Sequence, residues 1–137
     1  MAKTPTLQET VGIVKMLRDE HRQILAQFQL YLATEADSRQ LIVDQILQRL
    51  DDHFTVEEGL LGEGVRNQKN GVAVVAQILL DHEEVKAMMS ELRRAETDDD
   101  ESMDEFFKDM MQTVHVHFNV EERDFLPLLA GNTSPEA

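Results

Sequence analysis

The apolar residues of this 137-residue chain recur at spacings of three and four over four long segments. Such spacing marks one face of an α-helix, whereas the alternation typical of a β-strand is never sustained. The segments cover about 7–33, 38–61, 71–96 and 103–126. A helix of about 24 residues is about 36 Å long. Similar lengths and short connections predict an all-α fold, an antiparallel up-down-up-down four-helix bundle.

Local signals set the ends of these helices. Thr6 with Glu9, and Ser102 with Glu105, have the spacing of capping boxes that begin the first and last helices. The acidic run 98–101 predicts a solvated turn. Residues 1–130 are expected to form a single domain and residues 131–137 a flexible tail. The apolar face of the first helix, which is expected to point into the bundle, is predicted to include Leu32.

Composition excludes several classes of protein. The chain has 27 acidic and 13 basic residues, a net charge of −14, which disfavours binding to nucleic acid or to anionic membranes. It has no cysteine, so disulfides and thiolate metal sites are excluded. No signal peptide or membrane-spanning stretch is recognisable. We therefore expect a soluble, cytoplasmic protein.

An internal repeat relates the two halves of the sequence. The segment His-Phe-Thr-Val-Glu-Glu at 53–58 returns as His-Phe-Asn-Val-Glu-Glu at 117–122. Upstream, Asp-Glu-His at 19–21 resembles Asp-His-Glu at 81–83. The first and second pairs of helices are therefore predicted to be two copies of one hairpin, related by a pseudo-twofold axis.

The repeat places histidines and glutamates on the apolar faces of the helices. Residues four apart in a helix lie one above the other, which aligns the first histidine and the first glutamate of each repeated segment. One further histidine occupies the same kind of inward position in the first helix, and another in the third. We expect six side chains to converge near the middle of the bundle: His21, His53, Glu57, His82, His117 and Glu121.

Charge indicates that these six residues bind metal. Two carboxylates about 4 Å apart repel by about 4 kcal/mol at an effective dielectric constant of 20, and burial adds a desolvation cost. Two divalent cations shared by the carboxylates relieve both penalties. Imidazole and carboxylate ligands suit iron, manganese or zinc. The alternative is a polar core in which protons and hydrogen bonds satisfy the same groups.

Residues next to this cluster receive other roles. His115 is two positions from a predicted ligand and should face outward, as should Glu58 and Glu122. Glu20 and Glu83 are either acceptors for imidazole N–H groups or solvated charges.

With these motifs the sequence resembles the hemerythrin-like family, also called HHE cation-binding domains, over about residues 12–129. The two His-Phe-x-x-Glu-Glu segments and the Phe-Leu-Pro run at 125–127 carry the resemblance. It implies a four-helix bundle with a carboxylate-bridged, non-haem di-iron centre, held by the six residues above. Where oxygen-carrying members have a further histidine, this chain has Lys86. The resulting four-His, two-Glu set is similar to that of repair-of-iron-centres proteins.

The resemblance implies two functions. In the first, an oxo- or hydroxo-bridged pair of iron ions binds or reacts with oxygen, peroxide or nitric oxide. Such a protein is an oxidoreductase if an electron donor protein sustains turnover. In the second, the protein stores iron and donates it to an acceptor protein for repair of iron centres. Lys86 or Glu83 remains a candidate to complete the ligand set. The sequence does not decide whether the protein is an enzyme.

Overall fold

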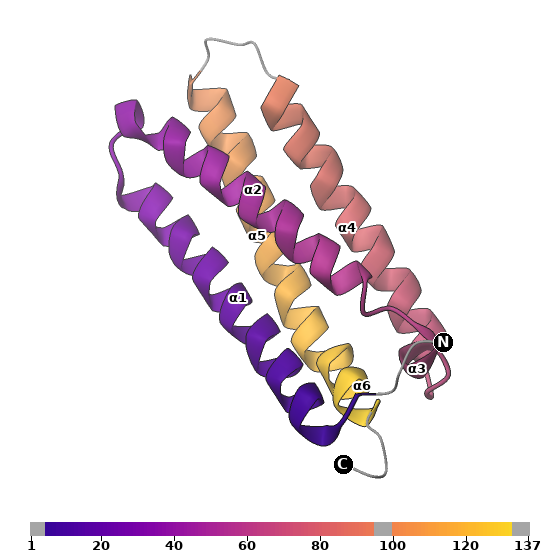
Figure 1. Cartoon of the computed structure of the whole chain (residues 1–137). Helices are drawn as coiled ribbons and strands as arrows, with labels where there is room; N and C mark the ends of the chain where they lie inside the picture. Colours follow the sequence, from indigo (N-terminus) through magenta and orange to yellow (C-terminus); the bar gives the residue numbers. More distant parts are fainter. Residues whose placement is uncertain (1–4, 95–99, 133–137) are drawn as a thin grey trace.

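The computed structural model describes residues 5–94 and 100–132. Four long helices lie side by side with alternating direction: α1 (Leu7–Ala33), α2 (Arg39–Glu58), α4 (Gly71–Arg94) and α5 (Asp100–Asp124) (Figure 1). The described residues include helices and no strand. The predicted all-α four-helix bundle is confirmed.

Three short elements occupy the connections: η1 (Ala36–Ser38), α3 (Glu63–Arg66) and α6 (Leu126–Gly131). Helix α6 packs against α1 and α5, and α3 packs against α4 and α6, so together they close the end of the bundle that contains the α2–α4 connection. Pro127 lies in the first turn of α6, where a missing N–H has no helical partner to lose. Residues 133–137 of the predicted tail lie outside the described residues.

The starts of the helices agree only in part with the capping signals. The predicted capping box of α1 is present, with Glu9 N–H donating to Thr6 Oγ1 at 3.1 Å. The box predicted at Ser102 is wrong, because α5 already begins at Asp100. Asp100 and Glu101, which were expected in a turn, therefore belong to the helix. Residues 98 and 99 of the predicted turn lie outside the described residues.

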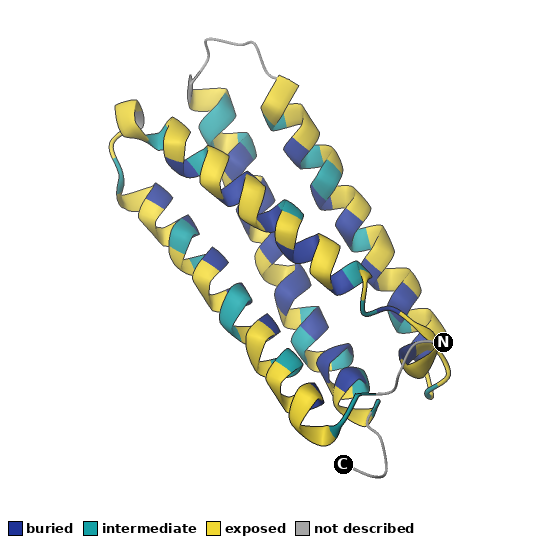
Figure 2. Cartoon of the chain, in the orientation of Figure 1, coloured by how far each residue is buried: buried dark blue, intermediate teal, exposed yellow. Residues whose placement is uncertain are grey.

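Two apolar clusters fill the bundle, one on each side of a polar layer. Figure 2 shows the buried residues recurring along the inner faces of the long helices. On α1, for example, Leu17 belongs to one cluster, Ile24 belongs to the other, and His21 lies between them. Both clusters are buried and contain aromatic side chains. The polar layer is therefore closed to water along the bundle axis.

On α1, one side chain that was predicted to point into the bundle points outward instead. Leu32 is 43% exposed, whereas its neighbour Tyr31 is buried and packs against Phe107. The 100° rotation between neighbouring residues turns Leu32 out when Tyr31 points in.

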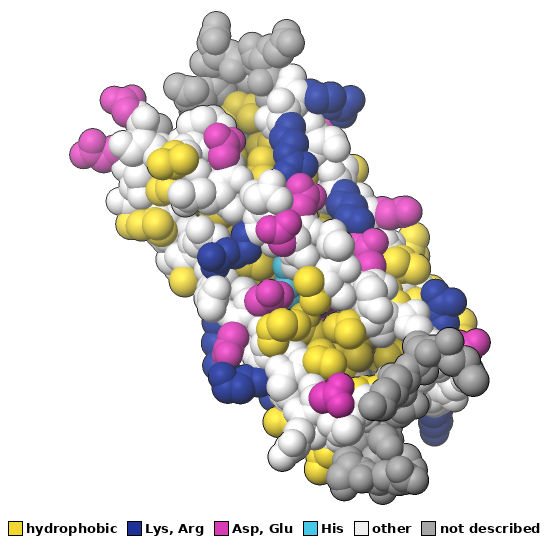
Figure 3. Space-filling model, in the orientation of Figure 1, with side chains coloured by type: hydrophobic (Ala, Val, Ile, Leu, Met, Phe, Trp, Pro, Cys, Tyr) yellow, Lys and Arg dark blue, Asp and Glu magenta, His cyan; other side chains and the backbone are white. Residues whose placement is uncertain are grey.

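At the surface, acidic and basic side chains are interspersed (Figure 3). Within the described ranges, no helix has the length and apolar character needed to cross a membrane.

Candidate metal centre

All four long helices contribute to the polar layer, and the structure brings together every one of the six predicted residues. None of the six is more than 3% exposed. They form two overlapping groups, within each of which one ligand atom per residue lies within 4.8 Å of the others. One group contains His21 and His53, the other contains His82 and His117, and both include Glu57 and Glu121.

The inner face of the cluster consists of imidazole Nε2 atoms opposite carboxylate oxygens. Within α2, His53 Nε2 lies 3.1 Å from Glu57 Oε2, and within α5 the equivalent distance from His117 Nε2 to Glu121 Oε1 is 3.2 Å. His21 Nε2 lies 3.4 Å from Glu57 Oε2 and 3.3 Å from Glu121 Oε1. The imidazole nitrogens and carboxylate oxygens of the cluster, which are the atoms that could bind a cation, therefore face one another.

A second carboxylate holds the outer nitrogen of each imidazole. Nδ1 lies within hydrogen-bond distance of a carboxylate oxygen in four pairs: His53–Glu20 at 2.6 Å, His21–Glu122 at 2.8 Å, His82–Glu58 at 2.9 Å and His117–Asp81 at 3.1 Å. A carboxylate at Nδ1 favours the tautomer in which Nδ1–H donates, which leaves the Nε2 lone pair free to bind metal. These carboxylates are 23–39% exposed.

Sequence reasoning identified only part of this outer layer. Glu20 accepts a hydrogen bond from an imidazole, which was one of the two roles predicted for it. Glu83, for which the same two roles were predicted, is exposed, and Asp81 occupies the position on α4 that is equivalent to Glu20. The expectation that Glu58 and Glu122 face outward is wrong. Each of these glutamates points away from the histidine of its own helix repeat, but its carboxylate reaches a histidine on a neighbouring helix. The sequence did contain a signal for these two acceptors, because each repeated segment ends in two adjacent glutamates and not in one.

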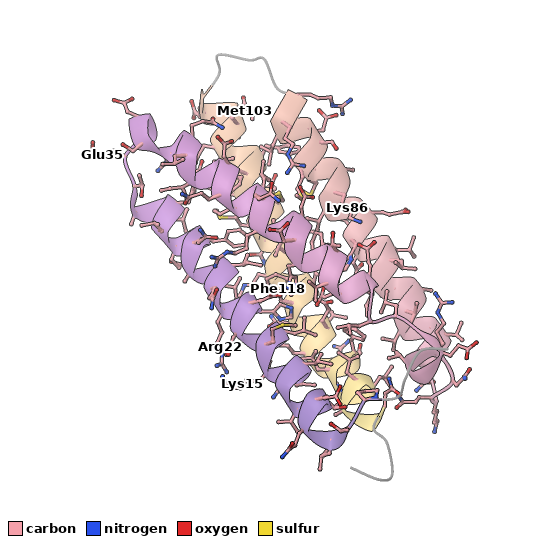
Figure 4. All side chains as sticks on the ribbon, viewed as in Figure 1. Lys15, Arg22, Glu35, Lys86, Met103 and Phe118 are labelled. Carbon is pink, nitrogen blue, oxygen red and sulfur yellow. The ribbon has the colours of Figure 1, made fainter. Side chains whose placement is uncertain are left out.

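The centre follows the pseudo-twofold relation that the repeat predicted. Glu20 on α1 pairs with a histidine on α2, just as Asp81 on α4 pairs with one on α5. Phe118 stacks on His21 at a ring separation of 3.9 Å, and Phe54 stacks on the equivalent histidine of α4 at 4.2 Å. Phe118 lies at the centre of the bundle in Figure 4. Each aromatic ring fixes an imidazole plane on one side.

The two inner carboxylates ionise unequally. Burial raises the pKa of Glu57, but the favourable interaction with the neighbouring imidazoles, including those of His21 and His53, outweighs burial and brings its pKa well below the usual value. Burial raises the pKa of Glu121 well above its usual value, and the charge of Glu57 raises it further. Burial also lowers the pKa of His117 to about 4, so this imidazole is neutral near pH 7.

Several inner atoms have no hydrogen-bond partner among the described residues. They are the Nε2 atoms of three imidazoles and three carboxylate oxygens: His21 Nε2, His53 Nε2, His117 Nε2, Glu57 Oε2, Glu121 Oε1 and Glu121 Oε2. Leaving buried polar atoms unpaired is costly, and native proteins rarely tolerate a group of them. Neutral imidazole and carboxylate are ligands for divalent first-row metals. The donor set therefore fits a pair of such ions.

Other candidate residues lie outside the inner cluster. Lys86 Nζ donates to Glu58 Oε2 at 2.7 Å, so it supports the outer layer and does not extend the inner donor set. His115 is exposed, as predicted, and lines a groove between α1 and α5. Tyr31 is buried in the apolar core, and its hydroxyl donates to Asp104 Oδ1 at 2.7 Å.

The fold and this cluster define a helical bundle with a buried cation-binding site. The sequence pattern of the hemerythrin HHE cation-binding domain matches residues 12–129. Because the match covers most of the chain, the protein belongs to this family, which confirms the resemblance found from its motifs. No curated protein and no solved structure matches the sequence significantly.

Proposed function

We propose that this protein binds two iron ions at the six-residue centre and uses them to bind or reduce oxygen, peroxide or nitric oxide. The observation that carries the proposal is the set of buried donors without hydrogen-bond partners, arranged as two groups that share Glu57 and Glu121. Membership of a cation-binding family supports metal binding. Mixed imidazole and carboxylate ligands suit iron, manganese and zinc alike, so the choice of iron is supported by the resemblance to di-iron members.

The protein's own groups have distinct tasks. The outer carboxylates orient the imidazoles, and the inner glutamates present oxygens to both groups. Each group provides two imidazoles and two carboxylates, which is fewer ligands than a six-coordinate ion takes. Bound iron would supply electron exchange and coordination positions for a small molecule. The two apolar clusters exclude water from this chemistry.

Burial favours retention of the metal over donation to another protein. None of the six donors is more than 3% exposed, so an acceptor's ligands cannot touch them without local opening of the bundle. A purely structural polar core is disfavoured by the unpartnered atoms, because such a core is stable only when its groups are satisfied. Both alternatives remain outcomes of the test.

The test is to mix iron-loaded, reduced protein with nitric oxide or peroxide and to record its spectrum and iron content. We expect spectral changes that saturate with the added molecule while the iron stays bound. Spectra that do not change, together with transfer of iron to a metal-free acceptor protein, would instead establish donation. A protein that takes up no iron would contradict both functions.

A further inference from the structure

A groove of about 620 Å³ between α4 and α5 leads from the surface to the candidate metal centre. Its lining includes His117, one of the six donors, and Asp81, the carboxylate that holds the Nδ1 of this imidazole. His117 is 3% exposed, the largest value among the six donors, and its Nε2 has no hydrogen-bond partner among the described residues. A donor with an unpaired ligand atom therefore lies at the inner end of an opening to solvent.

The charges along the groove favour a cation. Arg123 lines the groove, but it is paired with Asp124 of the same helix by two hydrogen bonds of 2.9 and 2.7 Å, so these opposite charges offset each other. Two carboxylates remain, the exposed Glu84 and, further in, Asp81, whose side chain is 23% exposed. Carboxylates along an opening attract cations and repel anions.

The pseudo-twofold relation provides an internal comparison on the α1–α2 face. The repeat relates Glu84 to Gln23 and Thr113 to Arg49. Arg49 on α2 donates to Gln23 on α1 at 3.0 Å. A guanidinium and an amide therefore join the two helices beside the donor His53, at the place that is equivalent to the groove.

The equivalent side chains do not join α4 to α5. The hydroxyl of Thr113 donates to the carbonyl of Asp109 in its own helix at 3.0 Å, and both Thr113 and Glu84 line the groove. Asp81 is also one methylene shorter than Glu20, the residue related to it on α1. The same position in the repeat is therefore a bridge that contains a cation on one face and an acidic opening on the other.

We propose that the α4–α5 groove is the route by which metal ions enter and leave the centre, and that Glu84 and Asp81 attract cations into it. The proposal rests on the metal binding of the proposed function and adds the path of loading and exchange. Exposure falls along this path from Glu84 through Asp81 to His117. On the opposite face, the bridge between Arg49 and Gln23 excludes the same ions.

The test copies the bridge of the α1–α2 face into the groove. Cobalt(II) is added to chelated protein in a stopped-flow instrument, and its visible absorption reports uptake. Glu84→Gln with Thr113→Arg should slow uptake by about tenfold, and Glu84→Gln alone by about threefold. The matched control is Glu83→Gln, which removes the same charge at an exposed neighbouring position that does not line the groove, and it should keep the wild-type rate.

Loss of cobalt to an excess of chelator distinguishes a blocked route from a weakened site. Because an ion that leaves must retrace the path by which it entered, the double variant should also lose cobalt about tenfold more slowly. Slower uptake with faster loss would overturn the proposal, because it would mean that the variant only weakens binding.

The reciprocal change tests the other face and separates this proposal from the proposed function. Gln23→Glu with Arg49→Thr should speed uptake by opening a second route. Wild-type uptake in the Glu84→Gln, Thr113→Arg variant would overturn the route even if the protein binds two metal ions. A wild-type protein that takes up no metal would contradict the proposed function and the route together. Slower uptake and loss in the variant, in a protein whose bound iron does not respond to nitric oxide or peroxide, would support the route while contradicting the proposed reaction.

Discussion

Lys86 Nζ lies 2.7 Å from Glu58 Oε2, the same oxygen that lies 2.9 Å from His82 Nδ1. Lys86 is labelled on α4 in Figure 4. The repeat relates Lys86 to Leu25 and Glu58 to Glu122. Within the described residues Glu122 pairs with His21 and with no Lys or Arg. An otherwise symmetric centre therefore has a cation on one side only.

Removing the positive charge of Lys86 should weaken the binding of one of the two metal ions. Burial raises the pKa of Glu58, and the bonds from Lys86 and His82 lower it below the usual value, so Lys86 keeps the carboxylate ionised and fixed against the imidazole. Changes to such outer partners cost about tenfold or more in metal affinity. We expect Lys86→Leu to lower the affinity of one of two metal-binding steps by about tenfold, as measured by calorimetric titration.

Two further variants serve as controls for this effect. Lys86→Arg keeps the positive charge and should bind both ions with nearly wild-type affinity. Leu25→Lys places a cation near Glu122 and should leave the step affected by Lys86→Leu unchanged. If Lys86→Leu and Lys86→Arg give the same two affinities as wild type, the charge of Lys86 has no role in metal binding.

The shared carboxylates should be required for the pair of ions. Glu57→Gln and Glu121→Gln each replace a carboxyl group that both groups share by an amide that cannot ionise, so each variant should lose the metal pair, as measured by elemental analysis. The matched control is His115→Ala, which changes the exposed histidine on the same helix as Glu121 and should retain wild-type metal content. Loss of metal in His115→Ala with full metal in Glu121→Gln would reject the ligand assignment.

Metal removal should lower the free energy of unfolding. A ligand that binds only the folded state stabilises it by several kcal/mol when its concentration is about a thousand times its dissociation constant. We therefore expect the chelated protein to unfold at a distinctly lower urea concentration than the loaded protein. The effect should disappear in Glu57→Gln. Identical unfolding curves for the loaded and chelated wild-type protein would mean that the cluster is only a polar core.

Tyr31 should make stability depend on pH in the alkaline range. Burial and the hydrogen bond to Asp104 raise the pKa of Tyr31 from 10.0 to about 12. The folded state therefore holds this proton more tightly than the unfolded state. The associated stabilisation is complete below pH 10 and is lost as the pH rises from 10 to about 12.

Tyr31→Phe should abolish this part of the pH dependence, which we expect to amount to about 1 kcal/mol after allowance for solvent screening. The chain has one tyrosine and no tryptophan, so the absorbance of the phenolate reports this residue alone. An absorbance titration of the folded protein with its midpoint near pH 10 would contradict the assigned environment.

The sequence was sufficient to predict the bundle and the inner cluster because both depend on helical periodicity. Residues four apart in a helix must share a face, so His53 and Glu57 could be placed together, and the repeat did the same for His117 and Glu121. His21 is more dependent on tertiary packing, but its place between two apolar stretches fixed its direction.

The outer layer was harder to predict because it depends on contacts between helices. Periodicity gives the angle of Glu122 around α5, but not the distance to α1, where its carboxylate reaches His21. The same limitation hid the bond between Lys86 and Glu58. Helix α6 was not predicted as a separate element for a different reason. Helix α5 ends at Asp124, and after Phe125 the chain continues as α6 from Leu126. Such interruptions are set by packing at the end of the bundle.

The most direct test of the di-iron proposal is the metal content of protein purified from iron-replete cells, together with its absorption spectrum. We predict close to two iron ions per chain and near-ultraviolet bands from charge transfer between a bridging oxygen and iron. A colourless, metal-free protein that unfolds at the same urea concentration with and without added iron would contradict this account.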